Sequence, residues 1–185
     1  IAMFYDLEYP HTFVQDLYEI LADDGIIVIQ MMDLMSMMKY GDFPNICHEH
    51  LEYYSLQVFE QLMQDHGLEV FDVEYNGVNG GSMRVYIRKD STRQINNVII
   101  LPALDAGSMR VYKALEAERI FFDEIGNTTN YFSALIEDVR TKVIEFIKEA
   151  NMLGNTVAVM GASTKGNTVL QYFGLTGKDI IHAAE

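Results

Sequence analysis

The sequence is poor in cysteine and in positive charge. Its 185 residues include one cysteine, Cys47, and 13 Lys and Arg against 27 Asp and Glu, which gives a formal net charge of −14. A single cysteine excludes an internal disulfide framework and suits a reducing compartment. The shortage of positive charge argues against a nucleic-acid partner, because affinity for its backbone depends mainly on Lys and Arg that neutralise phosphates.

The sequence also lacks any long apolar run. None approaches the roughly 20 residues that a membrane-spanning helix needs, and the segment "IAMFYDLEYPHTF" has neither a basic region nor a small-residue cleavage site. We therefore expect a cytoplasmic protein with no membrane partner. The hydrophobic content of 49% suffices for a core. The chain begins at Ile1 and stops directly after an apolar run, so we expect both ends to be cut.

The first 90 residues alternate between helical and extended patterns. The apolar spacing in "PHTFVQDLYEILADDG" predicts a helix, and the apolar run "GIIVIQM" predicts a buried parallel strand, which together make half of a βαβ unit. "LQVFEQLMQDHG" predicts a second helix that ends near Gly67. Residues 68–76 and 80–89 predict two strands joined by a turn rich in Gly and Asn. The first block is therefore α/β.

The second half begins with a predicted linker, "DSTRQINNVIILPALDAG", and continues as helix to Ala150. One apolar stripe supports that helix, and packing is its ordinary explanation. The stripe consists of Phe132, Leu135, Ile136, Val139, Val143, Phe146, Ile147 and Ala150. "TVAVMG" then predicts a short buried strand and "ASTKGNTVLQYFG" another helix, so a second α/β unit starts at about residue 155. The hexapeptide "GSMRVY" occurs twice, in a strand context and in a helical one, which we interpret as coincidence.

The richest group of reactive side chains lies in "FPNICHEHLEYYSL". If this segment is extended, His48, His50 and Glu52 share one face, while Cys47 and Glu49 take the other. A His-x-His pair is a common metal-ligand spacing, although no further clustered ligand set follows. A polar strand is the plainest interpretation. Proton transfer is the third, since a histidine beside a carboxylate often acts as a general base.

A second candidate site is "GASTKGNT", which follows a predicted strand and opens a helix. Backbone N–H groups and the helix dipole bind phosphate in such a setting. The loop does not match the P-loop pattern, because Gly161 and Gly166 have the spacing but Asn167 stands where a lysine should be. Ser163 and Lys165 could bind an oxyanion. The alternative is that the glycines only permit a sharp turn.

These motifs carry a resemblance to a known family. "FPNICHEHLEYYSL" resembles the "YHEHLxYxS" signature of sugar C-methyltransferases that act on nucleotide-linked keto-deoxysugars. "GGSMRVYIRK" is similar to the strand that closes their methyltransferase domain, and "VAVMGASTKGNTVLQYFGL" to the opening of their C-terminal domain. The resemblance implies an α/β chain with three parts. They are the end of a Rossmann-like class I methyltransferase domain (1–90), a helical connector (91–154) and the start of a second Rossmann-like domain (155–185).

The resemblance also implies roles for individual residues. The reaction removes a proton next to a ketone, and the resulting enolate takes the methyl group of S-adenosylmethionine (SAM). His50 would be the base, and Glu49 and His48 would orient it or the substrate. The implied contacts with the nucleotide-linked deoxysugar are Cys47, Arg84, Gly161, Ser163, Lys165, Gly166 and Asn167. One departure matters: Cys47 replaces the family's tyrosine, and a thiol is a weak hydrogen-bond donor.

In this family a cysteine-rich zinc-binding segment and a glycine-rich SAM loop precede the point at which this sequence begins. We therefore expect SAM to bind mostly upstream of Ile1, zinc only in that upstream segment, and no metal in this chain. We expect the chain alone to bind SAM weakly. Two alternatives stay open, namely a metal-dependent enzyme that uses His48, His50 and Glu52, and a non-catalytic nucleotide-binding module built around "GASTKG".

Overall fold

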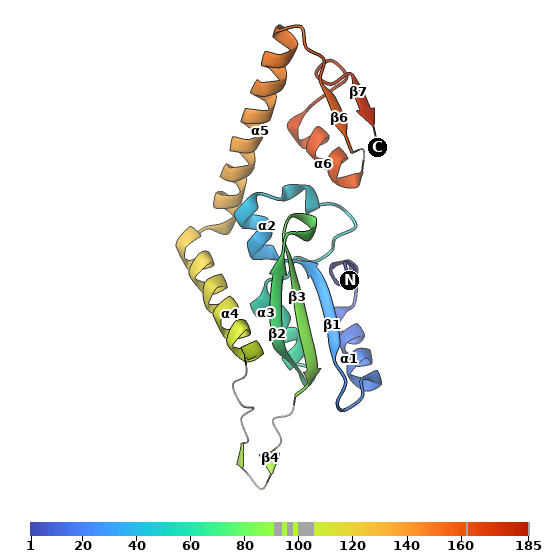
Figure 1. Ribbon diagram of the computed structural model, residues 1–185, viewed down its shortest axis with the longest axis vertical. Coiled ribbons are helices and arrows are strands. Elements are labelled where there is room, and N and C mark those ends of the chain that lie inside the picture. The colour runs from blue at the N-terminus through green and yellow to red at the C-terminus, as the bar shows by residue number, and fades with distance from the viewer. Residues whose placement is uncertain (91–93, 96–97, 100–105, 162, 185) are drawn as a thin grey trace. The chain divides into compact units, whose positions relative to one another are not determined.

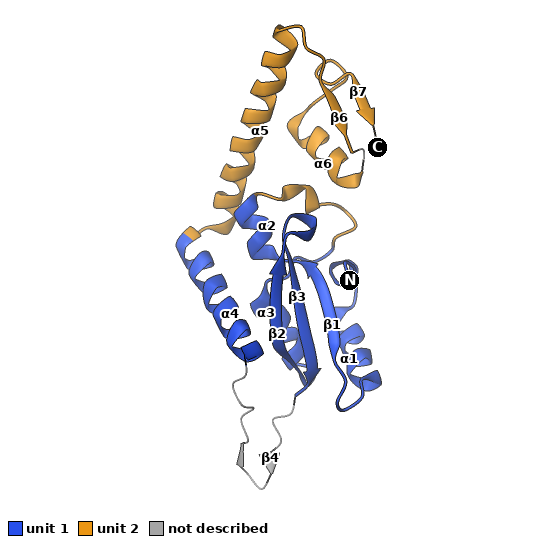
Figure 2. Ribbon diagram, viewed as in Figure 1, with its two compact units in different colours: residues 1–40, 51–124 blue, residues 41–50, 125–185 orange. Residues whose placement is uncertain are grey.

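The computed structural model describes residues 1–90, 94–95, 98–99, 106–161 and 163–184. Figure 1 shows the helices and strands, and Figure 2 shows the two compact units into which the chain divides. Unit 1 comprises residues 1–40 and 51–124, and unit 2 comprises residues 41–50 and 125–185. The segment 41–50, which holds both histidines of the "HEH" motif, therefore folds with the C-terminal part of the chain.

The sheet of unit 1 has the strand order β1-β3-β2. Strand β3 (Ser82–Lys89) lies between β1 (Ile27–Met32) and β2 (Leu68–Asn76) and is antiparallel to both. All three predicted strands are confirmed, but the parallel pairing expected for the "GIIVIQM" strand is wrong among the described strands. β1 and β2 do run in the same direction, yet β3 is inserted between them. An apolar run indicates burial and says nothing about the direction of the neighbouring strand.

Helices pack on this sheet through apolar side chains. Helix α1 (Pro10–Ile20) begins with a proline, which is tolerated in the first turn. Helix α3 (Leu56–Gln64) begins at Ser55, whose side chain accepts a hydrogen bond from the Val58 N–H. The other helical segments are η1 (Phe4–Asp6), α2 (Leu34–Tyr40), η3 (Val78–Gly80) and α4 (Ala106–Ile125). Fully buried side chains of the unit include Phe4, Val14, Leu56, Phe59, Met63, Leu68, Met83, Val85 and Ile87.

Helix α4 is attached to unit 1 by polar contacts as well as packing. The buried Glu118 carboxylate accepts hydrogen bonds from the backbone N–H groups of Leu56 (2.7 Å) and Gln57 (3.0 Å), at the start of α3. The Arg110 guanidinium pairs with the Asp72 carboxylate. The connector that the sequence predicts as one helical stretch thus begins with a helix fixed to the sheet and to α3 of unit 1.

Unit 2 contains a parallel β-α-β element. Strand β6 (Ala158–Met160) pairs in parallel with β7 (His182–Ala184), and α6 (Thr164–Phe173) connects them. The long helix α5 (Thr128–Met152) precedes them, and the 3-10 turn η2 (Phe43–Asn45) joins them from the earlier part of the chain. The unit's buried cluster consists of Phe43, Ile136 and Phe173, with Phe132, Val143, Val169 and Leu175 packed around it.

Two expectations for the second half have clear outcomes. The strand and helix predicted after Gly154 are confirmed by β6 and α6, but the expected burial of the strand is wrong, because Ala158 and Met160 are exposed and Val159 is half-buried. The two copies of "GSMRVY" lie in β3 and α4, so they are not a structural repeat. The predicted linker holds two short paired strands, β4 (Gln94–Ile95) and β5 (Val98–Ile99), and its last two residues, Ala106 and Gly107, already belong to α4. Residues 91–93, 96–97 and 100–105, which include Pro102, lie outside the described residues. None of the helices in the described residues has the length and apolar character to cross a membrane.

Candidate active site

The "HEH" segment is a turn. The His50 N–H donates to the Cys47 carbonyl at 3.2 Å and closes the turn directly after η2. The expected extended conformation is therefore wrong, and with it the shared face of His48, His50 and Glu52. Tight turns break the alternation of side chains on which that expectation depends. Pro44 lies in the 3-10 turn η2 (Phe43–Asn45) just upstream, so the chain enters the motif from a turn and not from a strand.

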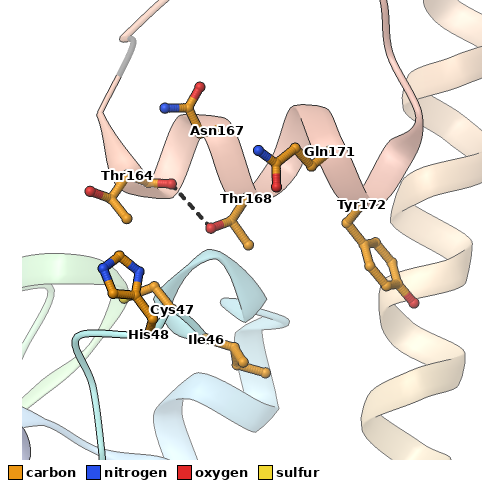
Figure 3. A pocket seen from close by; sticks show the side chains of 8 residues that line it. All are labelled: Ile46, Cys47, His48, Thr164, Asn167, Thr168, Gln171 and Tyr172. Carbon is orange, nitrogen blue, oxygen red and sulfur yellow. Dashed lines mark hydrogen bonds between the residues drawn. The ribbon is translucent and has the colours of Figure 1, made fainter.

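The turn forms one wall of a cavity of about 700 Å³ in unit 2. Ile46, Cys47 and His48 line it from the turn, and side chains of α6 line it opposite, as Figure 3 shows. The α6 residues are Thr164, Asn167, Thr168, Gln171 and Tyr172. Three predicted site residues, Cys47, His48 and Asn167, are thus brought together although about 120 positions separate them in the sequence.

The sequence analysis missed four of the α6 residues that line this cavity. Thr164, Thr168 and Gln171 form a polar stripe with Asn167, and the Thr168 hydroxyl donates to the Thr164 carbonyl at 3.1 Å. Residues three and four positions apart share one face of a helix. The spacing of these polar residues is visible in the sequence, but the prediction for this segment covered only a glycine-containing loop that opens a helix.

The Tyr172 ring completes the stripe and is fixed at its hydroxyl end. Its hydroxyl donates to the Glu137 carboxylate of α5 at 2.9 Å, and Arg140 pairs with the same carboxylate. This hydrogen bond raises the pKa of Tyr172 and lowers that of Glu137. The Tyr172 ring, the aromatic side chain of the cavity wall, is therefore fixed to α5 by this hydrogen bond.

His50 is half-buried and held by the backbone. Its Nδ1 lies 2.7 Å from the carbonyl oxygen of Asn45. A carbonyl can only accept a hydrogen bond, so Nδ1 must carry the proton. In the neutral ring the lone pair then lies on Nε2. The same carbonyl accepts the Cys47 N–H at 3.1 Å, so it also stabilises the turn.

A side-chain hydrogen bond between Asp42 and Asn45 stabilises the backbone just before this turn. The side chain of Asn45 is buried, and its amide donates to the Asp42 carboxylate. Burial raises the pKa of Asp42, although the nearby charge of Lys165 and the Asn45 hydrogen bond act in the opposite direction. Lys165, from the first turn of α6, thus lies near the carboxylate that precedes η2.

The "GASTKG" loop is shaped by its two glycines. Gly161 has φ +107°, a value that side chains disfavour, and a Cβ at Gly166 would lie 2.3 Å from the Gly161 carbonyl oxygen. The Ser163 hydroxyl oxygen accepts the Gly166 N–H at 3.5 Å and caps α6. Ala162 lies outside the described residues. The glycines and Ser163 therefore have structural functions in the loop, and their predicted contacts with the substrate stay predictions.

Arg84 and Glu52 belong to unit 1. The Arg84 guanidinium donates two hydrogen bonds to the side-chain oxygen of Gln30, at 3.0 and 2.8 Å, and lies 3.6 Å from Glu74. Its predicted contact with the substrate stays a prediction. Among the residues that the structure describes, no three or more His, Cys, Asp or Glu side chains gather in a way that could hold a metal ion.

The Cys47 thiol is free and half-buried, and its Sγ lies 3.9 Å from a carboxylate oxygen of Glu49. Cys47 and Glu49 therefore approach each other across the turn, while His48 faces the cavity. The position at which the resembled family has a phenol is here a smaller side chain on the cavity wall.

The α/β fold agrees with comparisons to known proteins. Residues 1–73 match a family described as "Methyltransferase domain", so this part of the chain is methyltransferase-like. Residues 77–185 match the family described as "C-methyltransferase C-terminal domain", and the chain belongs to this C-methyltransferase family. A curated relative is "C-methyltransferase NovU" of Streptomyces niveus, 31% identical over 172 residues. That match covers 92% of this chain and 38% of NovU, so the chain spans well under half the length of this relative.

Proposed function

We propose that this chain is part of a SAM-dependent C-methyltransferase whose substrate is a nucleotide-linked keto-deoxysugar. Its membership of the C-methyltransferase family supports the reaction type. The observation that carries the proposal is the cavity of unit 2, where Cys47 and His48 of the turn face the polar stripe of α6. His50 is held two residues further along the same turn and is not among the residues that line the cavity. The hydroxyl and amide groups around the cavity suit a substrate with many oxygen atoms, and the nearby histidines suit one whose carbon next to a ketone can lose a proton.

His50 is the general base in this proposal. The C–H bond next to the ketone breaks, its electron pair forms the enolate, and the proton passes to Nε2 of His50. The hydrogen bond from Nδ1 to the Asn45 carbonyl supports this role, because it selects the tautomer with the lone pair on Nε2. It also stabilises the imidazolium that forms, since hydrogen bonds from a charged donor are stronger than neutral ones. Glu49 and His48 orient the base or the substrate.

The cavity wall and the loop bind the substrate in this proposal. Neutral hydroxyl and amide groups such as Asn167 and Gln171 can donate to and accept from sugar oxygens. Cys47, across the cavity, contributes a weak donor at most. Lys165 and Ser163, with the backbone at Gly161 and Gly166, lie at the N-terminus of α6, a position that favours phosphate oxygens. Arg84 is a further predicted contact.

The methyl donor supplies an electrophilic carbon to the enolate. Binding of such a cofactor by a Rossmann-like domain depends on a glycine-rich loop between a strand and a helix. Residues 1–76 offer no such loop, since their glycines are the isolated Gly25, Gly41 and Gly67. We therefore assign no residue of this chain to SAM, and zinc is proposed only for a segment outside it. The division into 1–90, 91–154 and 155–185 and the cytoplasmic location stay predictions.

The test of this proposal separates proton removal from methyl transfer. In an active preparation of the enzyme, His50→Ala should lower kcat by a factor of about 10² or more with little change in KM. Exchange of the substrate's α-proton with deuterated water, measured without SAM, should disappear as well. His182→Ala, which removes an exposed histidine from β7, is the matched control and should leave both rates intact. Undiminished exchange in His50→Ala would remove His50 from the role of base.

A further inference from the structure

One peptide carbonyl, that of Asn45, holds the Nδ1 side of the His50 ring. This oxygen accepts the Nδ1–H of His50 at 2.7 Å and the Cys47 N–H at 3.1 Å. Both bonds lie in the turn that follows η2. A shift of this carbonyl would therefore weaken the hydrogen bond to Nδ1 of His50 and the bond that stabilises the turn together.

Side chains hold the Asn45 carbonyl in place. Asn45 is 1% exposed, and buried amides of this kind are hydrogen-bonded almost without exception. Its amide donates a hydrogen bond to the carboxylate of Asp42, three residues earlier. This bond links the residue before η2 to the last residue of η2. Phe43, between them, is buried against Phe173 of α6, with ring centroids 5.4 Å apart. The 3-10 turn is thus fixed to the core of unit 2 through its ring and closed by the Asp42–Asn45 bond.

We propose that Asp42 and Asn45 are positioning residues for the reaction, because they hold the Asn45 carbonyl where it keeps His50 in the tautomer with its lone pair on Nε2. Neither side chain needs to touch the substrate. The inference rests on the proposed function of His50 as the base. Its physical content, the tautomer of His50, can nevertheless be measured without any reaction.

The first measurement is the nitrogen chemical shifts of the histidine rings in the 185-residue chain labelled with ¹⁵N-histidine. The signals of His50 are assigned by their loss in His50→Gln. We expect the Nδ1–H tautomer in the unchanged protein and a mixture of both tautomers in Asp42→Ala. Asp42→Asn should keep the original tautomer, because its amide oxygen can still accept from Asn45. Asp138→Ala, which removes a surface carboxylate of α5, is the control.

The second measurement is kinetic and uses the active enzyme. Asp42→Ala should lower kcat and the α-proton exchange rate about tenfold or more, the scale expected when a reacting group is slightly misplaced, with KM within about twofold. Asp42→Asn should recover most of both rates. If circular dichroism shows that Asp42→Ala is unfolded, Asp42→Glu replaces it, because one added methylene displaces the acceptor and should mix the tautomers in the same way.

An unchanged His50 tautomer in folded Asp42→Ala would overturn the positioning role, and so would a loss confined to KM. These failures differ from failure of the proposed function. If His50→Ala retains proton exchange, the base assignment is wrong, whereas the nitrogen shifts still decide whether Asp42 controls the tautomer.

Discussion

Replacing Glu118 with alanine should weaken the attachment of α4 to the start of α3 in unit 1. The Glu118 carboxylate accepts the backbone N–H groups of Leu56 and Gln57, two of the donors that the first turn of α3 leaves without a partner inside the helix. Ser55 caps the same turn through the Val58 N–H. A residue 62 positions away therefore completes the capping of this helix.

The expected size of the effect follows from the burial of each donor. Leu56 is 0% exposed, so its N–H would lose its partner away from water at a cost of about 1–3 kcal/mol. Gln57 is exposed, so water can replace most of its lost bond. We expect Glu118→Ala to lower the free energy of unfolding by about 2–3 kcal/mol. Glu118→Gln keeps an acceptor oxygen and removes a buried charge, so it should stay within about 1 kcal/mol.

The effect should also depend on pH in one direction. Burial raises the pKa of Glu118 above its ordinary value of 4.5, although the Gln57 and Leu56 hydrogen bonds act against it. Between the pKa of Glu118 in the unfolded chain, about 4.5, and its raised pKa in the folded protein, the folded protein binds more protons than the unfolded chain. The free energy of unfolding therefore falls as the pH rises through this range. Glu118→Gln cannot titrate. Its stability relative to the unchanged protein should therefore improve as the pH rises above about 4.5.

Urea denaturation followed by circular dichroism, at several pH values from about 4.5 to 7.5, measures both effects. Glu116→Ala is the matched control, because Glu116 lies on the exposed side of the same helix and pairs with Arg119. It should change stability much less than Glu118→Ala does. A loss below about 0.5 kcal/mol in Glu118→Ala, the range of an ordinary surface substitution, would refute the capping argument.

Three further predictions concern unit 2. If Lys165 binds a phosphate oxygen, Lys165→Ala should raise KM by the equivalent of about 1.5–3 kcal/mol and leave kcat nearly intact. Lys142→Ala, on the surface of α5, is the control and should leave KM unchanged. An unchanged KM in Lys165→Ala would mean that the loop only lets the chain turn. Gly166→Ala should lower the melting temperature, because its Cβ would lie 2.3 Å from the Gly161 carbonyl oxygen and only backbone movement can relieve the clash; an unchanged Tm would contradict this geometry. Phe43→Ala should cost about 3–5 kcal/mol in urea denaturation, as other buried aromatic truncations do, and a cost near zero would show that η2 is not anchored by this ring.

Local signals in the sequence determined much of the fold. Gly67 indicated where α3 ends, while the cap residues Ser55 and Ser163, whose hydroxyl oxygens accept backbone N–H groups of the first turns of α3 and α6, are local signals that the predictions did not use. Alternating and helical apolar spacing located β2, β3, α1 and α5. The residue types of the "HEH" motif and of "GASTKG" indicated where chemistry lies. These signals act over a few neighbouring residues, so they can be read without a structure.

The grouping of the site residues depended on long-range contacts. The sequence did not show that residues 41–50 fold with α6, nor that Asn167 and His48 line one cavity. The η2 turn just before "HEH" is likewise anchored by Phe43 in the core of unit 2, a contact that side-chain alternation along an extended segment does not predict. Contacts between residues this far apart are set by the packing of whole elements.

The hexapeptide "GSMRVY" shows the division most directly. In β3 its residues alternate, so Met83 and Val85 are both fully buried in the sheet of unit 1. In α4 the same letters form a helix, and Gly107 and Val111, one helical turn apart, are the buried positions. The six residues by themselves allow either conformation. The surface available for packing decided which conformation formed. The first copy packs beside the neighbouring strand β1, and the second packs against the outer strand β2 near Phe71 and Asp72.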